Sequence, residues 1–102
     1  MDFSEALTKV RERHRIRRGT WPRSHYVVAQ DGYPDGIKIN GNTARATGEP
    51  EGTVMPFRPY LMRYRVYEGF SPWTPDQLDL FADDWEATPV DREPKLSAGA
   101  FG

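Results

Sequence analysis

The sequence predicts a small α+β domain, in which helices pack against a small antiparallel sheet. Three observations predict this class. Apolar residues recur at helical spacing near the N-terminus, short segments further along alternate as strands do, and turn signals rich in Gly, Pro, Asn and Asp separate them. The length of 102 residues allows one domain with a modest core. Because 13% of the residues are aromatic, we also expect the domain to be oligomeric.

The first predicted element is an N-terminal helix. Four apolar residues recur at the spacing of one helix face: Phe3, Ala6, Leu7 and Val10. Asp2 is placed to cap this helix, and Glu5 follows three residues later, in the position that completes a capping box. We expect the helix to end near Glu12.

A hairpin of two strands follows the helix. Ile16 lies between Arg15 and Arg17, and this alternation predicts a strand that runs toward Trp21. A turn at 22–24 then leads to 26–30, which is rich in aromatic and β-branched residues. These two segments are predicted to pair.

A long polar excursion, Asp31–Tyr60, follows this hairpin. Loops of this length are uncommon in a compact domain unless they bind a ligand or carry structure of their own. Asn42 is a good N-cap and Gly48 a good helix terminator, so we expect a short helical turn at 43–47. After the turn signal at 50–52 the chain returns to strand character.

The clearest strand is predicted at Tyr60–Tyr67, where aromatic and apolar side chains alternate with arginines. A tight turn at 68–69 brings 70–73 back alongside it. Thr74 is then expected to cap a short C-terminal helix, with proline at its first position. Three residues are predicted to form its buried face: Leu78, Phe81 and Ala82.

The chain is expected to end with a short strand at 84–87 and a flexible tail. The tail has too little apolar content to order itself. We therefore divide the chain into one ligand-binding domain, residues 1–87, and a tail, residues 88–102.

Composition excludes several classes of function. The chain has no apolar run long enough to span a bilayer and no signal-peptide pattern, so we expect a cytoplasmic location and no membrane partner. It has no cysteine and only two histidines, so no disulfide, thiolate metal site or cofactor is expected. Seven of its 14 basic residues fall between Lys9 and Arg23, but the net charge of −1 disfavours binding to duplex nucleic acid.

Catalytic residues are few. His14 and His25 have no metal-like spacing. Four carboxylates cluster near the C-terminal helix: Asp76, Asp79, Asp83 and Asp84. This cluster is either a metal site or, more simply, a solvated helix face. We find no nucleophile beside a base and no phosphate-cradling glycine loop.

The sequence offers more for holding a nucleotide than for cleaving one. Each of four arginines can form two parallel hydrogen bonds to phosphate oxygens: Arg17, Arg18, Arg23 and Arg58. Four rings can stack on a base: Trp21, Tyr26, Tyr60 and Trp73. Packing in the core is the alternative role for each ring. At the start of the C-terminal helix, Thr74 and Asp76 are expected to contact ribose hydroxyls or base edges.

Several sequence blocks occur in an order typical of one family. They are FSEAL at 3–7, GYPDGI at 32–37, EGTVM at 51–55, FRPY at 57–60 and DLFADDW at 79–85. Arg18 three residues before Trp21, and the Pro72-Trp73 pair, belong to the same series. The chain thereby resembles the second type of phage Thoeris anti-defence protein from Asp2 to about Trp85. It differs from the family pattern at Arg13 and Thr20, which replace glycines, and at Asp76, which replaces a serine.

This resemblance implies a non-enzymatic sponge, typically a homotetramer, that encloses a glycocyclic ADP-ribose isomer in the cytoplasm of the infected host. Some relatives hold cyclic dinucleotides at separate sites. The ligand-binding residues expected here are Arg18, Trp21, Tyr26, Arg58, Tyr60, Trp73, Thr74, Asp76 and Asp79. No catalytic or metal-binding residue is expected.

Three alternatives remain open at this stage. The first is a sponge for cyclic dinucleotide or oligonucleotide signals of the CBASS type. The second is a module that binds a host protein through the long excursion. The third is a hydrolase of the same signal that uses the acidic cluster and a metal.

Overall fold

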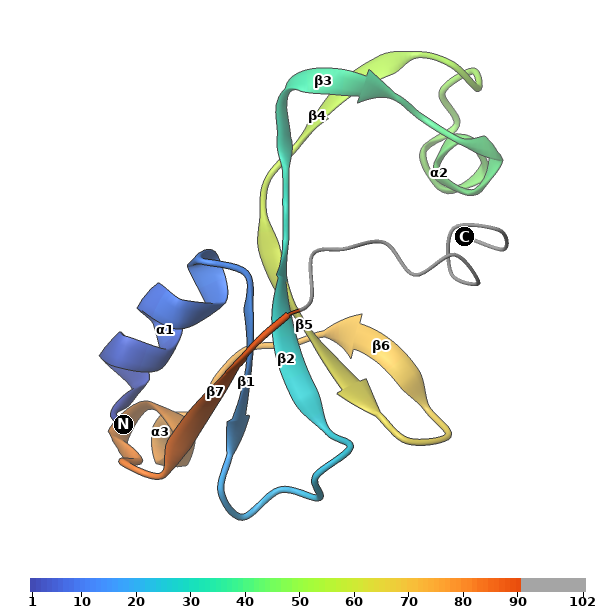
Figure 1. The fold of residues 1–102 in the computed structure, drawn as a ribbon. Coiled ribbons are helices and arrows are strands. Elements are labelled where there is room, and N and C mark those ends of the chain that lie inside the picture. The colour runs from blue at the N-terminus through green and yellow to red at the C-terminus, as the bar shows by residue number, and fades with distance from the viewer. Residues whose placement is uncertain (91–102) are drawn as a thin grey trace.

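The computed structural model describes residues 1–90, so most of the predicted tail, residues 91–102, lies outside the described residues. The elements are α1 (Phe3–Arg11), β1 (His14–Arg18), β2 (Tyr26–Gln30), β3 (Tyr33–Lys38), α2 (Gly41–Thr47), β4 (Val54–Phe57), β5 (Tyr60–Arg65), β6 (Gly69–Pro72), α3 (Gln77–Phe81) and β7 (Trp85–Pro89). This arrangement confirms the α+β class with a small antiparallel sheet (Figure 1).

The main sheet has five antiparallel strands in the order β6-β5-β2-β1-β7. The predicted hairpin is confirmed, because β1 and β2 pair with Ile16 opposite Val27. The predicted pairing of β5 with β6 is also confirmed, with Tyr64 opposite Phe70. Strand β7 pairs with β1 along its whole length and extends to Pro89, two residues past the predicted strand.

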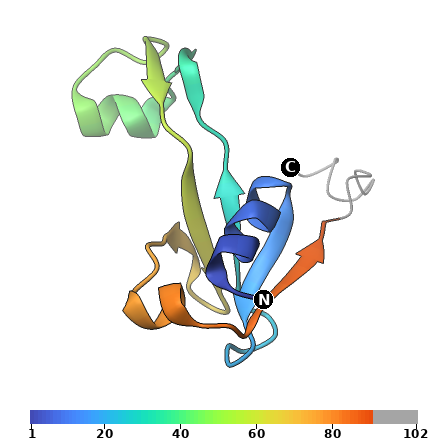
Figure 2. The same ribbon diagram turned by 90° about the vertical axis from the view of Figure 1, so that its left-hand side faces the viewer.

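Side-chain alternation gives this sheet two different faces. Helix α1 packs on β1, β2 and β7, and both α1 and α3 lie on the same side of the sheet (Figures 1 and 2). We call this the inner face. Its core consists of Ala6, Val10, Ile16, Val27 and Trp85. On the opposite side, the outer face, no helix of residues 1–90 packs on the strands.

The capping box of α1 is confirmed, since the Asp2 carboxylate accepts from the Glu5 N–H at 2.8 Å and the Glu5 side chain accepts from the Asp2 N–H. The chain then turns at Arg13 with φ of 71°, a left-handed conformation that favours glycine. Arg13 forms an ion pair with Asp31. This exposed contact ties the turn to the end of β2.

Two predicted caps are wrong. Helix α2 begins two residues earlier than predicted, because the Asn40 side chain, not that of Asn42, accepts from the Thr43 N–H. Helix α3 begins later than predicted, because Asp76 and not Thr74 is its N-cap. In both cases the observed cap is a residue type that Ncap positions favour, so local preference alone could not choose between neighbours.

The predicted buried face of α3 is also wrong in part. Leu78 is 78% exposed and Phe81 84% exposed, whereas Ala82 packs against the core. A helix of only five residues makes little more than one turn, so it buries few of its side chains.

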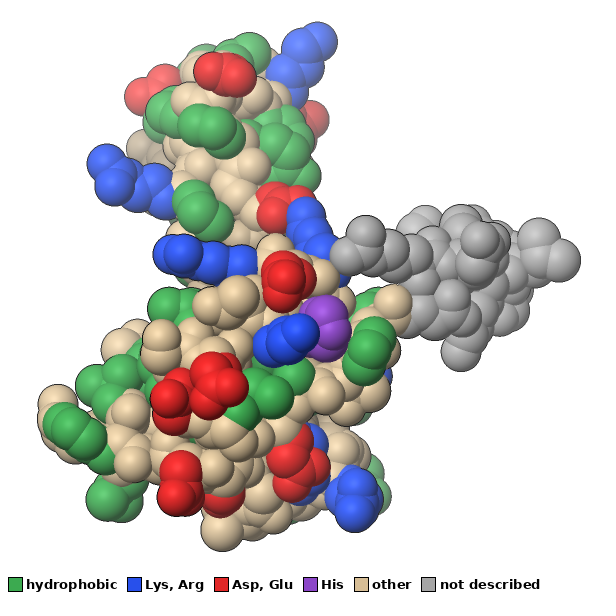
Figure 3. Space-filling model, turned by 60° about the vertical axis from the view of Figure 1, so that its left-hand side comes forward, with side chains coloured by type: hydrophobic (Ala, Val, Ile, Leu, Met, Phe, Trp, Pro, Cys, Tyr) green, Lys and Arg blue, Asp and Glu red, His purple; other side chains and the backbone are tan. Residues whose placement is uncertain are grey.

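The long excursion forms an arm, residues 33–57, which projects away from the main sheet (Figures 1 and 2). Strands β3 and β4 pair only with each other, and α2 connects them. Strand character was predicted after Gly52, but β3 was not predicted. Ile39 is the buried residue of the arm, at 4% exposure, and Figure 3 shows hydrophobic side chains on the arm's surface.

The arm joins the main sheet where the backbone strands come very close. A Cβ on Gly32 would lie 2.5 Å from the Phe57 carbonyl oxygen and 2.6 Å from the Pro59 nitrogen. Real Cβ atoms do not approach backbone atoms so closely. Only glycine fits this junction without a shift of the backbone.

Candidate functional site

Six of the nine predicted site residues lie in one region, where the end of β1, the end of β6 and the start of α3 meet on the inner face. They are Arg18, Trp21, Trp73, Thr74, Asp76 and Asp79. The other three lie elsewhere. Tyr26 is on the outer face, opposite Tyr64. Arg58 and Tyr60 are at the base of the arm, where they line a cavity of about 210 Å³ together with Tyr33 and Lys38.

Three tryptophans form a contiguous group, which we call the tryptophan cluster: Trp21, Trp73 and Trp85. Trp21 meets Trp73 edge to face with ring centroids 6.0 Å apart, and meets Trp85 at 5.4 Å. Trp85 is buried, and its indole N–H donates to the Asp79 carbonyl at 2.9 Å. Trp21 and Trp73 are only half-buried, so they form the part of the cluster that solvent reaches. Edge-to-face pairs favour such fixed ring orientations.

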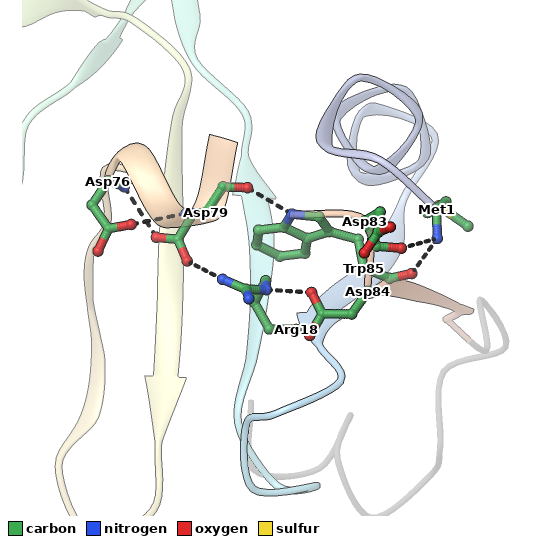
Figure 4. Close-up of polar contacts among 7 residues, drawn as sticks. All are labelled: Met1, Arg18, Asp76, Asp79, Asp83, Asp84 and Trp85. Carbon is green, nitrogen blue, oxygen red and sulfur yellow. Dashed lines mark hydrogen bonds and ion pairs between the residues drawn. The ribbon is translucent and has the colours of Figure 1, made fainter. Parts of the chain in front are cut away.

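Arg18 lies beside this cluster and is held by two carboxylates (Figure 4). Its Nε donates to Asp84 at 2.5 Å and its Nη1 donates to Asp79 at 3.0 Å. The hydrogen bond with Asp84 is the largest cause of a raised pKa at Arg18; burial opposes it, and the hydrogen bond with Asp79 raises the pKa further. The same hydrogen bond lowers the pKa of Asp84.

The Asp79 carboxylate has a second role in the same network. It accepts from the Asp76 N–H at 3.0 Å, while Asp76 accepts from the Asp79 N–H at 2.8 Å, which completes the capping box of α3. Arg18 therefore ties β1 to the start of α3 and to the residue before β7. One guanidinium faces two carboxylates, which leaves little positive charge at Arg18 for a phosphate.

A different arginine has its charge available at this site. Arg63 of β5 is opposite Val27, so its side chain emerges on the inner face. Its guanidinium carbon lies 3.6 Å from the centroid of the Trp21 ring, a cation–π contact. Within residues 1–90, Arg63 forms no ion pair, and its buried Nε has no hydrogen-bond partner. Burial, and next the neighbouring Arg65, lower its pKa.

These contacts divide the predicted arginines by role. Arg18 forms ion pairs with two carboxylates that hold β1, α3 and β7 together. Arg63 forms no ion pair within residues 1–90, and its guanidinium packs against an aromatic ring. A desolvated cation without a carboxylate is a group that a phosphate can satisfy with charge-assisted hydrogen bonds. Sequence reasoning missed Arg63. The available signal was strand alternation, which separates Arg63 from Tyr64 but does not tell which face is the inner one.

The acidic residues near α3 do not form a recognisable metal site in the described residues. In the part of the chain that the structure describes, no group of three or more His, Cys, Asp or Glu side chains is arranged to hold a metal ion. Across the same residues no helix has the length and apolar character needed to cross a membrane.

Comparison with protein-family models identifies a matching family. The family model of the Thoeris anti-defense 2-like domain matches residues 1–88, which include every element of the described fold except the last residue of β7. No curated protein matches the chain.

Proposed function

Because the chain belongs to the Thoeris anti-defense 2-like family, we propose that it binds and sequesters a cyclic nucleotide immune signal without degrading it. Membership of this family implies a role against Thoeris defence. The proposed ligand is a cyclic ADP-ribose isomer, glycocyclic ADP-ribose, whose removal starves the Thoeris effector in the cytoplasm of the infected bacterium. The contact of Arg63 with Trp21 is the observation that supports this proposal most directly.

The proposed contacts follow from the chemistry of the ligand. Its phosphates carry charge, and Arg63 is a desolvated cation without a carboxylate partner in the described residues. Its base is flat, and the half-buried rings of Trp21 and Trp73 each provide stacking worth about 1–3 kcal/mol. Thr74, which follows Trp73 and is exposed, is proposed to contact a ribose hydroxyl.

Sequestration requires tight binding, and nanomolar affinity corresponds to about 12 kcal/mol. Two stacked rings and one phosphate contact supply only part of this free energy, so the site has to be enclosed. Helix α3 begins at this site, and its Leu78 and Phe81 are largely exposed. We propose that a second copy of the chain covers this apolar surface and closes the site, in a homotetramer.

The contacts of the nearby carboxylates are consistent with a protein that releases its ligand unchanged. Asp79 and Asp84 are both bonded to Arg18, and Asp76 caps α3. A carboxylate held by an arginine is a weak general base, because the arginine stabilises its charged form. The proposed role of this acidic group is therefore to position α3 and β7.

A retention assay tests the proposal. The protein is incubated with glycocyclic ADP-ribose, freed of unbound ligand by gel filtration and heat-denatured, and the supernatant is analysed by mass spectrometry. We expect intact ligand in a fixed ratio to protein. Recovery of linear product, or of no nucleotide, would overturn the proposal.

Two variants and a ligand panel sharpen the assay. Arg63→Gln is expected to retain little ligand, whereas Arg45→Gln, a matched change in the exposed helix α2, is expected to retain as much as the parent. Cyclic dinucleotides are tested in parallel. Retention of these alone would identify the protein as a sponge for CBASS-type signals instead.

A further inference from the structure

A second cavity lies on the outer face of the sheet, away from the tryptophan cluster. Its volume is about 580 Å³. It is lined by Arg15, Arg17, Arg23, Ser24, Tyr26, Tyr64 and Thr88. The register explains this composition, because Tyr26 is opposite Tyr64 and Arg15 is opposite Thr88, so that all four side chains emerge on the face that α1 does not cover.

The cavity carries a net positive charge. Arg17 forms an ion pair with Glu86 at 3.1 Å and donates to the Trp21 carbonyl. Arg15 and Arg23 form no ion pair within residues 1–90. Two of the three guanidinium charges are therefore uncompensated. In addition, the Arg17 side chain is only 13% exposed, and its buried Nε has no hydrogen-bond partner in the described residues. This N–H is therefore available to a ligand.

The aromatic residues hold this charge in a defined place. Tyr26 stacks on Tyr64 with ring centroids 5.4 Å apart and an interplanar angle of 23°, and Phe70 meets both rings. The guanidinium carbon of Arg15 lies 4.3 Å from the centroid of Tyr26. An arginine packed on a ring has fewer conformations to lose when it binds an anion, so the site is preorganised.

We propose that this cavity is a second binding site, which takes a phosphorylated ligand of mononucleotide size. Its volume falls within the range of about 300–1,000 Å³ that small-molecule sites occupy. Arg15 and Arg23 bind the phosphate, Arg17 supplies a further N–H, and the tyrosine pair lies beside the aromatic or sugar portion. The site is separate from the tryptophan cluster and does not depend on the proposed sequestration.

Calorimetry on the full chain tests this site with AMP and inorganic pyrophosphate, and with adenosine as the ligand that lacks phosphate. The Arg15→Gln/Arg23→Gln double variant is expected to bind AMP about 10-fold or more weakly than the parent. Lys9→Gln/Arg11→Gln makes the same change in net charge on α1, at the partly exposed Lys9 and the exposed Arg11, and is expected to bind as the parent does. Adenosine is expected to bind far more weakly than AMP.

Several outcomes would overturn the proposal. These are no binding of AMP or pyrophosphate by the parent, equal losses in the two double variants, or equal affinity for AMP and adenosine. If Arg15→Gln/Arg23→Gln lowers the melting temperature, Arg23→Gln alone serves instead, because Arg23 is exposed and lies outside the strands.

Two further measurements test whether AMP binds at the tryptophan cluster instead, and whether the cavity binds a longer nucleic acid. Arg63→Gln is expected to lose the cyclic signal but to keep AMP affinity, so failure at one site does not imply failure at the other. A single-stranded oligonucleotide is compared with AMP at equal nucleotide concentration. Binding of the oligonucleotide alone would contradict a site of mononucleotide size.

Discussion

The Arg63 guanidinium packs on the Trp21 ring at 3.6 Å from its centroid, while Arg18, only three residues from Trp21 in sequence, is bonded to Asp79 and Asp84. The two arginines therefore differ in the charge they can offer to a ligand. Arg18 faces two carboxylates, whereas Arg63 is desolvated and has no carboxylate partner in the described residues. This difference leads to opposite expectations for their substitution.

The first prediction concerns affinity. Arg63→Gln removes a charged hydrogen-bond donor from the proposed ligand site, so we expect affinity for glycocyclic ADP-ribose to fall about 10- to 100-fold, with little change in melting temperature. Calorimetry and thermal melting measure the two quantities. Arg45→Gln is the control, because it removes one positive charge from the arm and is expected to leave the affinity unchanged. Unchanged affinity in Arg63→Gln as well would show that the ligand binds elsewhere.

The second prediction concerns stability. Arg18→Gln leaves the buried Asp79 without its guanidinium, so we expect the free energy of unfolding to fall by about 2 kcal/mol. For a domain of this size that corresponds to roughly 10 °C in melting temperature. Urea unfolding followed by tryptophan fluorescence measures the change. A variant that melts normally but has lost ligand affinity would instead give Arg18 the role in ligand binding that the sequence suggests.

The third prediction concerns the stability of the protein in acid. The hydrogen bond from Arg18 lowers the folded-state pKa of Asp84 below its ordinary value of 3.8. The resulting stabilisation is complete above pH 3.8 and is lost as the pH falls through the folded pKa. We expect Asp84→Asn to be less stable at neutral pH and to show a weaker acid dependence of the unfolding free energy. Asp83→Asn, at an exposed neighbour, is expected to keep the parent's acid dependence.

The fourth prediction concerns the junction of the arm. Gly32→Ala places a Cβ within 3 Å of the backbone at Phe57 and Pro59, so the two chains have to separate. We expect faster amide hydrogen exchange in β3 and β4 and little change in β1 and β7. Exchange that stays at the parent's rate in the arm would show that the junction accommodates the methyl group.

The fifth prediction concerns assembly. Phe81→Asp places a charge on the exposed apolar side of α3, where we propose that a second copy packs, so we expect this variant to sediment as a smaller species than the parent in analytical ultracentrifugation. Tyr67→Asp is the matched control, because Tyr67 is fully exposed in a turn and aspartate tolerates its φ of 67°. The same mass for the parent and Phe81→Asp would remove α3 from the proposed interface.

The elements that the sequence predicts well are those specified by neighbouring residues. Helix α1 has its periodic apolar face and its capping box within one short segment, and β5 shows clear alternation. Strand β3 lacks such a local signal, because it contains Pro34 and Gly36, which usually interrupt strands. It is specified by pairing with β4, which is distant in sequence.

The site is predictable only in part, for the same reason. Trp21 and Trp73 are recognisable as rings near turns, and they do meet. The roles of the arginines depend on tertiary contacts that no local pattern reveals. Arg18 is paired with carboxylates more than 60 positions away. Arg63 reaches Trp21 because the pairing of β5 with β2 places it opposite Val27, on the inner face.

The tip of the arm is a suitable position for an inserted affinity epitope. Gly48 and Gly52 have no atom within 4 Å of the position that a Cβ would occupy, and they flank the connection between α2 and β4. Exposed connections of this kind accept insertions. A short epitope placed there lies away from the tryptophan cluster and from the cavity on the outer face of the main sheet (Figure 1). The protein can therefore be purified from infected cells through the epitope, and any ligand that it carries can be identified.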